Sequence, residues 1–408
     1  MPNKNLAFWL VLALAGSTFA LTMGARQTMG LFLSAINTST GLGVASISLA
    51  FAFGQLWWGL TQPFAGAMAD KHGSGRVIFA GICLVALGTF LTPFMQSTWG
   101  LILTIGVLAA GGAGMAGPAV LMATATRMVP TEKRGITTGI VNAGGSFGQF
   151  LMAPLAGVLM SQFGWMTAMQ VMGIIVLLAL PASFMLSGSP ISNTAANPTA
   201  STATTNKPLS TLAAIKVAFN FPSYWLLCAG FFVCGFHIAF LATHLPGVIA
   251  MCGLPTEFGA WSLAMIGLFN IVGSIAMGWA VGRWRMKSLL SLVYALRGLG
   301  VLAFLLAPKT GTVMLLFAAL MGLTFLSTVP PTVGLVAKFF GPSNMATLYG
   351  IVMVVHQIGG FLGAWLGGKV LDATGSYDWM WYVDILLALA AALIHLPIKE
   401  AKLTRVSA

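Results

Sequence analysis

Two arginines lie deep inside long apolar segments, and a buried guanidinium is a natural binding group for a carboxylate. Arg26 lies about 16 Å inward from Asn37 along a helix, at 1.5 Å per residue. Arg297 lies about 15 Å inward from Lys287 by the same count. Each costs about 2.5–3.5 kcal/mol to place at the centre of a membrane helix, so such residues usually face a protein interior and mark a pathway.

The acids that could neutralise these arginines are few. The chain holds seven Asp and Glu residues against 19 Lys and Arg. Among these acids, Glu257 and Asp378 stand at the first residues of predicted spans, near the outer surface, and only Asp384 falls deeper, near the outer end of the last span. A buried positive charge without a resident anion should attract an anionic substrate. For Arg26 the alternative is a structural arginine capped by backbone carbonyls, and for Arg297 it is support of a neighbouring helix.

Polar residues recur at a spacing of seven, which keeps each pair on one helix face. The pairs are Gln55 and Gln62, Asn142 and Gln149, and His237 and His244. Their side chains can bind carboxylate oxygens, or they can hydrogen-bond between helices at about 0.6 kcal/mol per contact. We expect these residues to line the substrate cavity: Arg26, Gln27, Gln55, Asn142, Gln149, His237, Asn270, Arg297, His356 and Gln357.

Other chemistries find little support. Three histidines in apolar segments could meet, but no carboxylate or thiolate motif accompanies them, so we expect no metal site. The four cysteines lack zinc or redox spacing. No nucleotide-binding loop is present, and serines such as Ser146 have no base beside them in sequence. We therefore expect neither an enzyme nor a bound cofactor.

The composition is that of a membrane protein. Hydrophobic residues make up 58% of the 408 residues and charged residues only 6%, where soluble domains carry about a quarter. Apolar runs of about 20 residues indicate helices and not barrel strands. We predict an all-α membrane protein with twelve transmembrane helices: 7–36, 44–69, 77–96, 99–127, 135–160, 165–186, 219–251, 257–281, 288–307, 311–337, 345–371 and 378–397.

An internal repeat divides the chain into halves. Glycines match at a constant offset of 211 positions, for example Gly139 with Gly350 and Gly148 with Gly359. A segment rich in Ser, Thr, Asn, Ala and Pro separates the halves. We predict two pseudo-symmetric six-helix bundles, 1–186 and 214–408, joined by a flexible linker, 187–213. Repeats of this kind commonly place a binding site between their halves.

The basic residues set the topology. They alternate onto one side of the predicted spans together with both termini, which predicts cytoplasmic termini and a cytoplasmic linker. The net charge of +12 thus reflects membrane orientation, and no basic stripe with aromatics suggests nucleic acid. We predict a multi-pass plasma-membrane protein of a bacterial inner membrane, surrounded by lipid and monomeric.

The loop after the second span reads Gly66-Ala67-Met68-Ala69-Asp70-Lys71-His72-Gly73-Ser74-Gly75-Arg76. It resembles the loop signature of the major facilitator superfamily. The resemblance implies a conformational latch made by Gly66, Asp70 and Arg76, in which the carboxylate meets a helix N-terminus and a neighbouring arginine. The second half carries Gly278, Gly282, Arg283 and Lys287 at a similar offset but has no acid for a second latch.

Within that superfamily the chain looks most like bacterial relatives of the monocarboxylate transporters and the oxalate–formate exchanger. The resemblance rests on Arg26 before Gly30-Leu31-Phe32, on Gly54-Gln55 and on Gln62-Pro63. Those families place an acid and an arginine in span eight, where this chain has Asn270 and Ser274. Their proton-coupling scheme and two-cation grip on substrate are therefore not carried over.

These observations predict secondary active transport of a small organic anion, a mono- or dicarboxylate, by alternating access. Import against an interior-negative potential costs about 2.3 kcal/mol per 100 mV, so it requires proton symport or anion exchange. With no acid at the midplane, a proton would travel on His237, His356 or the substrate. The alternative is efflux of small amphiphilic or drug-like compounds by proton antiport.

Overall fold

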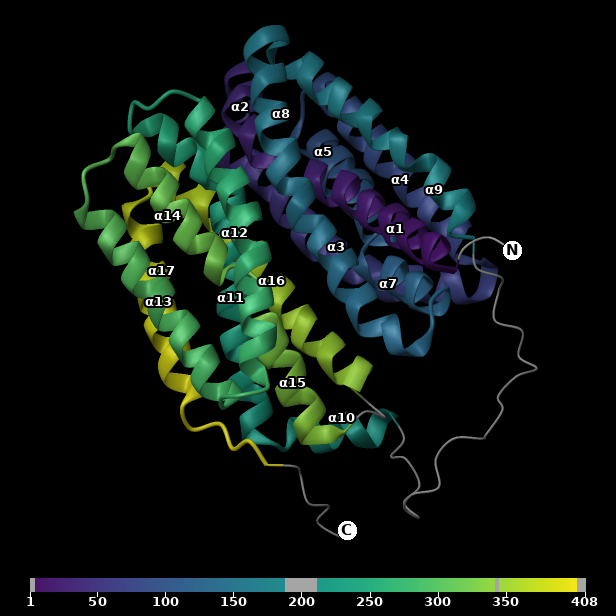
Figure 1. Ribbon diagram of the computed structural model, residues 1–408. Coiled ribbons are helices and arrows are strands. Elements are labelled where there is room, and N and C mark those ends of the chain that lie inside the picture. Colours follow the sequence, from purple (N-terminus) through teal and green to yellow (C-terminus); the bar gives the residue numbers. More distant parts are fainter. Residues whose placement is uncertain (1–3, 188–210, 342–344, 402–408) are drawn as a thin grey trace, which may run out of the picture.

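The protein folds into two bundles of helices that lie side by side (Figure 1). The computed structural model describes residues 4–187, 211–341 and 345–401, and it contains only helices and loops in those ranges. Most of the predicted linker, 187–213, lies outside the described residues. Helix α10 (Thr211–Phe219) begins at Thr211, so its first three residues fall within the predicted linker.

The N-terminal bundle contains the helices up to residue 185. They are α1 (Lys4–Gln27), η1 (Met29–Phe32), α2 (Leu33–Thr40), α3 (Val44–His72), α4 (Ser74–Leu91), η2 (Thr92–Phe94), α5 (Thr98–Leu101), η3 (Ile102–Ala109), α6 (Ala110–Met115), α7 (Pro118–Arg127), η4 (Thr131–Lys133), α8 (Arg134–Val176), η5 (Leu177–Ala179) and α9 (Leu180–Met185).

The C-terminal bundle follows after residue 210. Its helices after α10 are α11 (Pro222–Met251), α12 (Glu257–Val281), α13 (Met286–Leu306), α14 (Gly311–Thr324), α15 (Val329–Phe340), α16 (Met345–Thr374) and α17 (Asp378–His395).

The number of membrane spans agrees with the repeat. Among the described residues, eleven helical stretches are long and apolar enough to cross a membrane. One of them, Arg134–Met185, has 52 residues and is bent at Gly164, whose φ of 77° is outside the helical range. A helix of that length would measure about 78 Å, more than twice the hydrocarbon thickness, so it crosses twice. The fold therefore has the twelve predicted transmembrane segments.

Both halves break the same span. The fourth span is interrupted between α6 and α7, at Ala116 and Gly117 before Pro118. The tenth is interrupted between α14 and α15, and Ser327 in that break is 211 positions after Ala116. Broken membrane helices need side chains to satisfy the freed backbone groups, and they often lie at binding sites.

Glycines allow the central helices of each bundle to touch. A Cβ on Gly148 would overlap the carbonyl oxygen of Ala20, where α8 crosses α1. A Cβ on Gly359, its equivalent in the repeat, would overlap the carbonyl of Phe232, where α16 crosses α11. Small residues that bring backbones together are a main source of helix association in lipid. The repeated glycines therefore build the same crossing twice.

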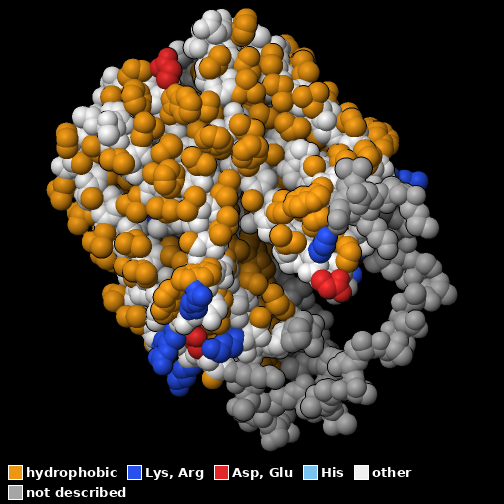
Figure 2. All heavy atoms as spheres, viewed as in Figure 1, with side chains coloured by type: hydrophobic (Ala, Val, Ile, Leu, Met, Phe, Trp, Pro, Cys, Tyr) orange, Lys and Arg blue, Asp and Glu red, His pale blue; other side chains and the backbone are white. Residues whose placement is uncertain are grey.

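The two bundles meet along two equivalent seams, α3 with α16 and α8 with α12. We call the end of the molecule that carries Asp70 and Arg127 the basic end, and the end that carries Asp372 the opposite end. The seams are closed toward the opposite end. Toward the basic end the bundles diverge, since a Cβ on Gly139, Gly278 or Gly350 would meet no atom within 4 Å. Figure 2 shows a recess between the two lobes, which opens where Lys and Arg side chains gather.

Glycine-to-alanine substitutions should separate packing glycines from free ones. We expect Gly148→Ala and Gly359→Ala each to lower stability by about 1–3 kcal/mol, because an added methyl forces the helices apart. The matched controls are Gly139→Ala and Gly350→Ala, which should be neutral or stabilising by up to about 1 kcal/mol through helix propensity. Thermal unfolding in detergent measures both pairs, and equal behaviour of the two pairs would contradict the assigned crossings.

Candidate functional site

Arg26 lies in the last turn of α1 and is half-buried. Its Nη2 donates to Oε1 of Gln55 on α3 at 2.6 Å. Its guanidinium carbon lies 4.8 Å from the centre of the Trp58 ring, within the range of a cation–π contact. The residue thus has a neutral amide and an aromatic face as partners, and no carboxylate among the described residues forms an ion pair with it.

A small cavity adjoins the guanidinium. It measures about 30 Å³, and its walls come from α1, η1, α3 and the fourth span. The lining residues are Arg26, Met29, Phe51, Gly54, Gln55, Ile105, Ala109 and Ala110. The fourth span contributes a π-helical stretch there, Ile102–Ala109, a conformation that is often found at functional sites. In this conformation the cavity has room for a water or two beside the charge.

The other half of the molecule approaches Arg26 through α16. A Cβ on Gly360 would lie 3.5 Å from Cβ of Gln55, and one on Gly59 would overlap the side chain of Gln357. Two buried donors in this region, Trp58 Nε1 and Gln357 Nε2, have no hydrogen-bond partner among the described residues. Arg26 and these two groups therefore offer several unused N–H donors next to the seam between the halves.

The second seam contains an equivalent crossing. Asn270 on α12 donates through Nδ2 to the Ser146 hydroxyl on α8 at 2.8 Å, and its Oδ1 accepts from the Leu326 backbone N–H at 3.0 Å. Gly59 and Gln357 are related to Asn270 and Ser146 by the 211-residue repeat. The two seams therefore end at equivalent positions of the repeat, and a polar residue lies at each of these crossings.

The remaining predicted cavity residues on α1 and α8 differ in how far they are exposed. Gln27 is half-buried, and Asn142 is exposed where α8 leaves the seam toward the basic end. Gln149 is fully buried between α8 and α12, and neither of its polar atoms has a partner in the described part of the chain. Asn142 is therefore the most accessible of the three in this conformation, and Gln149 is inaccessible.

The histidines fall into two groups. His244 is satisfied on both sides: Nε2 donates to the Ala364 carbonyl at 2.7 Å, so Nδ1 accepts from the Tyr377 hydroxyl at 3.0 Å. His237 and His356 are buried and incompletely bonded. Nε2 of His237 lies 3.3 Å from Oδ1 of Asp384 on α17, inside the C-terminal bundle. Neither histidine lines the cavity beside Arg26.

Arg297 stabilises the break in the tenth span. It is 2% exposed, and its Nη2 donates to the carbonyls of Thr324 and Phe325, the latter at 2.7 Å. These carbonyls end α14, where the helix dipole is negative and intrahelical partners are missing. The geometry favours the supporting role over substrate binding, because Arg297 does not line the Arg26 cavity.

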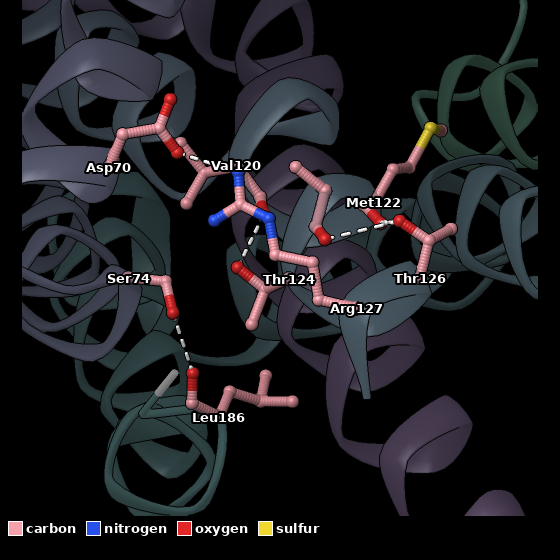
Figure 3. A network of polar contacts seen from close by, with 9 residues as sticks. Asp70, Ser74, Val120, Met122, Thr124, Thr126, Arg127 and Leu186 are labelled. Carbon is pink, nitrogen blue, oxygen red and sulfur yellow. Dashed lines mark hydrogen bonds and ion pairs between the residues drawn. The ribbon is translucent and has the colours of Figure 1, made fainter. Parts of the chain in front are cut away.

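The predicted latch at the basic end contains one ion pair. Asp70 and Arg127 lie 2.6 Å apart and point toward one another (Figure 3). Both belong to the N-terminal bundle and are about half exposed, so the pair is worth about 0–1 kcal/mol. Arg76 is exposed and makes no ion pair with a described residue. Gly66 has open space where a side chain would be.

The C-terminal half has an ion pair equivalent to that of Asp70 and Arg127, but its acid does not come from the equivalent loop. Lys287 and Lys338 are the repeat equivalents of Arg76 and Arg127. Glu400, which follows the last span, accepts from the Lys287 backbone N–H at 2.7 Å and lies 3.2 Å from Nζ of Lys338. The acid missing from the repeat is thus supplied by the C-terminal segment.

A carboxylate joins the two halves at the opposite end. Oδ2 of Asp372, near the end of α16, accepts from the Ala45 backbone N–H at 2.9 Å. Ala45 lies in the first turn of α3, where a negative charge is favourable. Tyr377 lies nearby, and burial, with a smaller contribution from Asp372, raises the pKa of its phenol. This is the interaction that the sequence predicted for Asp70, found at the other end with Asp372.

The arrangement agrees with comparisons to known proteins. The family model of the Major Facilitator Superfamily matches residues 12–364 and, in a second match, residues 261–408. The chain belongs to the Major Facilitator Superfamily. As a member of that superfamily it is a membrane transporter and not an enzyme.

Curated relatives in the superfamily cover nearly the whole chain. Monocarboxylate transporter 11 of Mus musculus is 25% identical over 403 residues, which covers 96% of this chain and 88% of the relative. Monocarboxylate transporter 13 of Rattus norvegicus is 25% identical over 95% of this chain and 89% of its own. The uncharacterized MFS-type transporter YcxA of Bacillus subtilis is 22% identical, with 95% and 94% covered.

Solved structures of the superfamily share the fold. The D-xylose-proton symporter matches with a TM-score of 0.75 at 13% identity, covering 98% of this chain and all of the other. A bacterial homologue of the human lysosomal transporter Spinster matches with a TM-score of 0.70 at 15% identity, with 96% and 95% covered. These likenesses establish two six-helix bundles of the major facilitator type.

Several functional candidates escaped the sequence prediction. Trp58 is three residues after Gln55, so its helical spacing could have placed it beside Arg26. Asp384 is 1% exposed, although its place near the outer end of a predicted span suggested a peripheral position. Asp372 and Glu400 carried no local signal, because their partners lie 327 and 113 residues away in sequence.

Substitution of Arg297 should test its supporting role. Arg297→Leu leaves the carbonyls of Thr324 and Phe325 without their partner, and we expect a loss of about 1–3 kcal/mol for an unpaired buried acceptor. The control is Arg285→Leu, an exposed arginine at the start of α13. Thermal unfolding in detergent should show a marked decrease only for Arg297→Leu; equal melting temperatures would remove Arg297 from the helix break.

Proposed function

We propose that this transporter carries a small organic anion, a monocarboxylate, and that Arg26 binds its carboxylate group. The observation that carries the proposal is the environment of Arg26: a half-buried guanidinium beside a cavity, held by Gln55 and Trp58 with no acidic partner. The names of relatives at about 25% identity point to the same class of substrate.

The chemistry of binding follows from the free donors. Guanidinium presents five N–H groups in a fork that matches a carboxylate in two parallel hydrogen bonds. Only one strong bond, to Gln55, is used in this conformation. An arriving carboxylate would replace the Gln55 oxygen as acceptor, while Trp58 keeps the cation in place. In this conformation the cavity is smaller than any organic acid, so binding would also require it to widen.

Transport would proceed by rocking of residues 1–186 against residues 214–408, with 187–213 as a tether. The excess of basic residues at one end assigns that end to the cytoplasm, with both termini, by the positive-inside rule. In that orientation this conformation is inward-facing. The protein would then lie in the inner membrane of a bacterium and act as a monomer, since a single chain supplies both halves of the site.

Latches at the two ends would alternate. In this conformation Asp372 of α16 binds the N-terminus of α3 and holds the opposite end closed. In the other conformation Asp70 would have the same role at the basic end, with Gly66 allowing close approach and Arg76 adding positive charge. Glu400 with Lys338 would hold the C-terminal bundle together as Asp70 with Arg127 holds the N-terminal one.

Loss of the Arg26 charge should abolish carboxylate transport. We expect Arg26→Gln to weaken carboxylate binding by about tenfold to a hundredfold, as for hydrogen bonds to a charged group. Uptake into proteoliposomes would be measured with a panel of radiolabelled acetate, lactate, pyruvate and oxalate, and binding by thermal shift with the same acids.

The matched control for Arg26→Gln is Arg283→Gln. Arg283 lies just outside a span, and its guanidinium packs over the Trp279 ring. Arg283→Gln should transport like the wild type. Unchanged uptake by Arg26→Gln would remove Arg26 from the site. A wild type that is stabilised only by neutral amphiphiles would favour efflux of such compounds instead.

Loss of Asp372 should favour the conformation that opens at the opposite end. We expect Asp372→Ala to shift the equilibrium by about fivefold, which corresponds to about 1 kcal/mol for a charge at a helix N-terminus. Spin labels at the two ends of the seam would report the distance change. Asp378→Ala, an exposed acid at the same end that makes no ion pair across the seam, should leave the distances unchanged. An unchanged distribution in Asp372→Ala would exclude the latch.

A further inference from the structure

The C-terminal bundle contains a buried acid. Of the seven acids of the chain, Asp384 alone is buried, at 1% exposure. It lies six residues into α17, so it is about 9 Å from the start of that helix. A buried carboxylate in a membrane span is costly, and it is usually a functional group with a specific partner.

Its nearest titratable partner is His237 in the middle of α11. Oδ1 of Asp384 and Nε2 of His237 lie 3.3 Å apart, and neither atom has a hydrogen bond to another described residue. That separation is short enough for the two groups to share one proton after a small rotation of either side chain. The histidine is 3% exposed, so water does not compete strongly for the pair.

The groups around the pair come from α11, α13, α16 and the break in the tenth span. Arg297 on α13 is close enough for its charge to act on Asp384, His237 and Cys234. Tyr294, one turn before Arg297, donates its hydroxyl to the Gly230 carbonyl, and His356 on α16 faces Phe231. The neighbouring break in the tenth span presents only hydroxyl and carbonyl groups, through Thr324 and Thr328.

The net charge of this cluster changes when it binds one proton. With Asp384 ionised and His237 neutral, the fixed charge of Arg297 is balanced. One added proton gives the cluster a net positive charge in an apolar interior, which is unfavourable unless the surroundings change. Proton binding at this pair is therefore tied to the conformation of the helices that carry it.

Those helices also form the seam between the halves. A Cβ on Gly235, two residues before His237, would overlap the carbonyl of His356 on α16. Five residues after His237, the Ala242 carbonyl contacts Gly30 of the N-terminal bundle with no room for a side chain. On its other face α16 presents Gly360 to Gln55, the hydrogen-bond partner of Arg26. A path of tight contacts thus connects the pair to the anion cavity.

We propose that Asp384 and His237 form the proton-binding site that couples this transporter to the proton gradient. The proposal rests on the proposed transport of a carboxylate. One proton carried inward with one monocarboxylate makes the cycle electroneutral and removes the cost of moving a negative charge against the potential. Span eight carries Asn270 at the seam and not an acid, so Asp384 supplies the carboxylate from span twelve.

The transport experiment compares net uptake with exchange. In Asp384→Asn proteoliposomes, uptake of the transported acid driven by an inward proton gradient should fall by about tenfold or more, within the range of coupling between linked sites. Counterflow, with the unlabelled acid inside, the radiolabelled acid outside and no proton gradient, should remain near the wild-type rate. His237→Gln should behave similarly, and Asp378→Asn, on the same helix but exposed, should keep both activities.

The outcomes are distinct. Gradient-driven accumulation that persists in Asp384→Asn would overturn the proposal, and a parallel loss of uptake and counterflow would assign the pair a structural role. If the wild type carries none of acetate, lactate, pyruvate and oxalate, the proposed substrate fails, and a second measurement still decides the proton site.

That second measurement is infrared titration of the wild type in detergent. Because Asp384 is the one buried carboxyl group among the seven, it should give a carboxylic acid band that appears as the site binds a proton and that shifts in Asp384→Glu. Asp384→Asn should lack the band. A wild-type spectrum without such a band, or a band that Asp384→Asn retains, would overturn the proposal.

Discussion

The structure depends on how two arginines inside the spans, Arg26 and Arg297, find partners in a chain that has almost no acids there. Arg297 uses the carbonyls that end α14, which belong to a helix break already present in the fold. Arg26 uses a single amide oxygen and an aromatic ring. Arg297 fixes a helix end and is 2% exposed, although its Nη1 has no partner among the described residues. Arg26 also leaves donors unused, and because it adjoins a cavity it is the residue that can exchange its partner for a ligand.

The repeat gives both halves the same geometry but not the same chemistry. Equivalent glycines build equivalent crossings in the two bundles, and the seams stop at equivalent levels. The side chains at these levels differ: the N-terminal bundle carries Arg26, and the C-terminal bundle carries Asp384 and His237. A symmetric scaffold can therefore hold a cation for a substrate on one side and an acid on the other, with α16 packed between them.

The sequence predicted the scaffold well because membrane helices are specified by length and apolarity. The predicted span 257–281 coincides with α12, and the glycine that bends α8 separates two predicted spans. The binding site was harder to predict, because the residue type does not show which neighbour a side chain points toward. His237 and His244 share a helix face at a spacing of seven, yet one is fully bonded to Tyr377 and Ala364 while the other meets Asp384. These partners come from helices more than a hundred residues away, which periodicity cannot reveal.

The seam between the halves is built for reversible closure. Along α3 and α16 it consists of small residues, aromatic edges such as Phe53 against Phe361 at 6.0 Å, and one exposed carboxylate at its end. Closing one end while the other opens exchanges similar apolar contacts along the repeated seams, and the charged contacts are each worth about 1 kcal/mol. Two conformations that differ only in which end is closed would then have similar free energies. A ligand that binds one of them through Arg26 needs only a modest difference in affinity to shift the population.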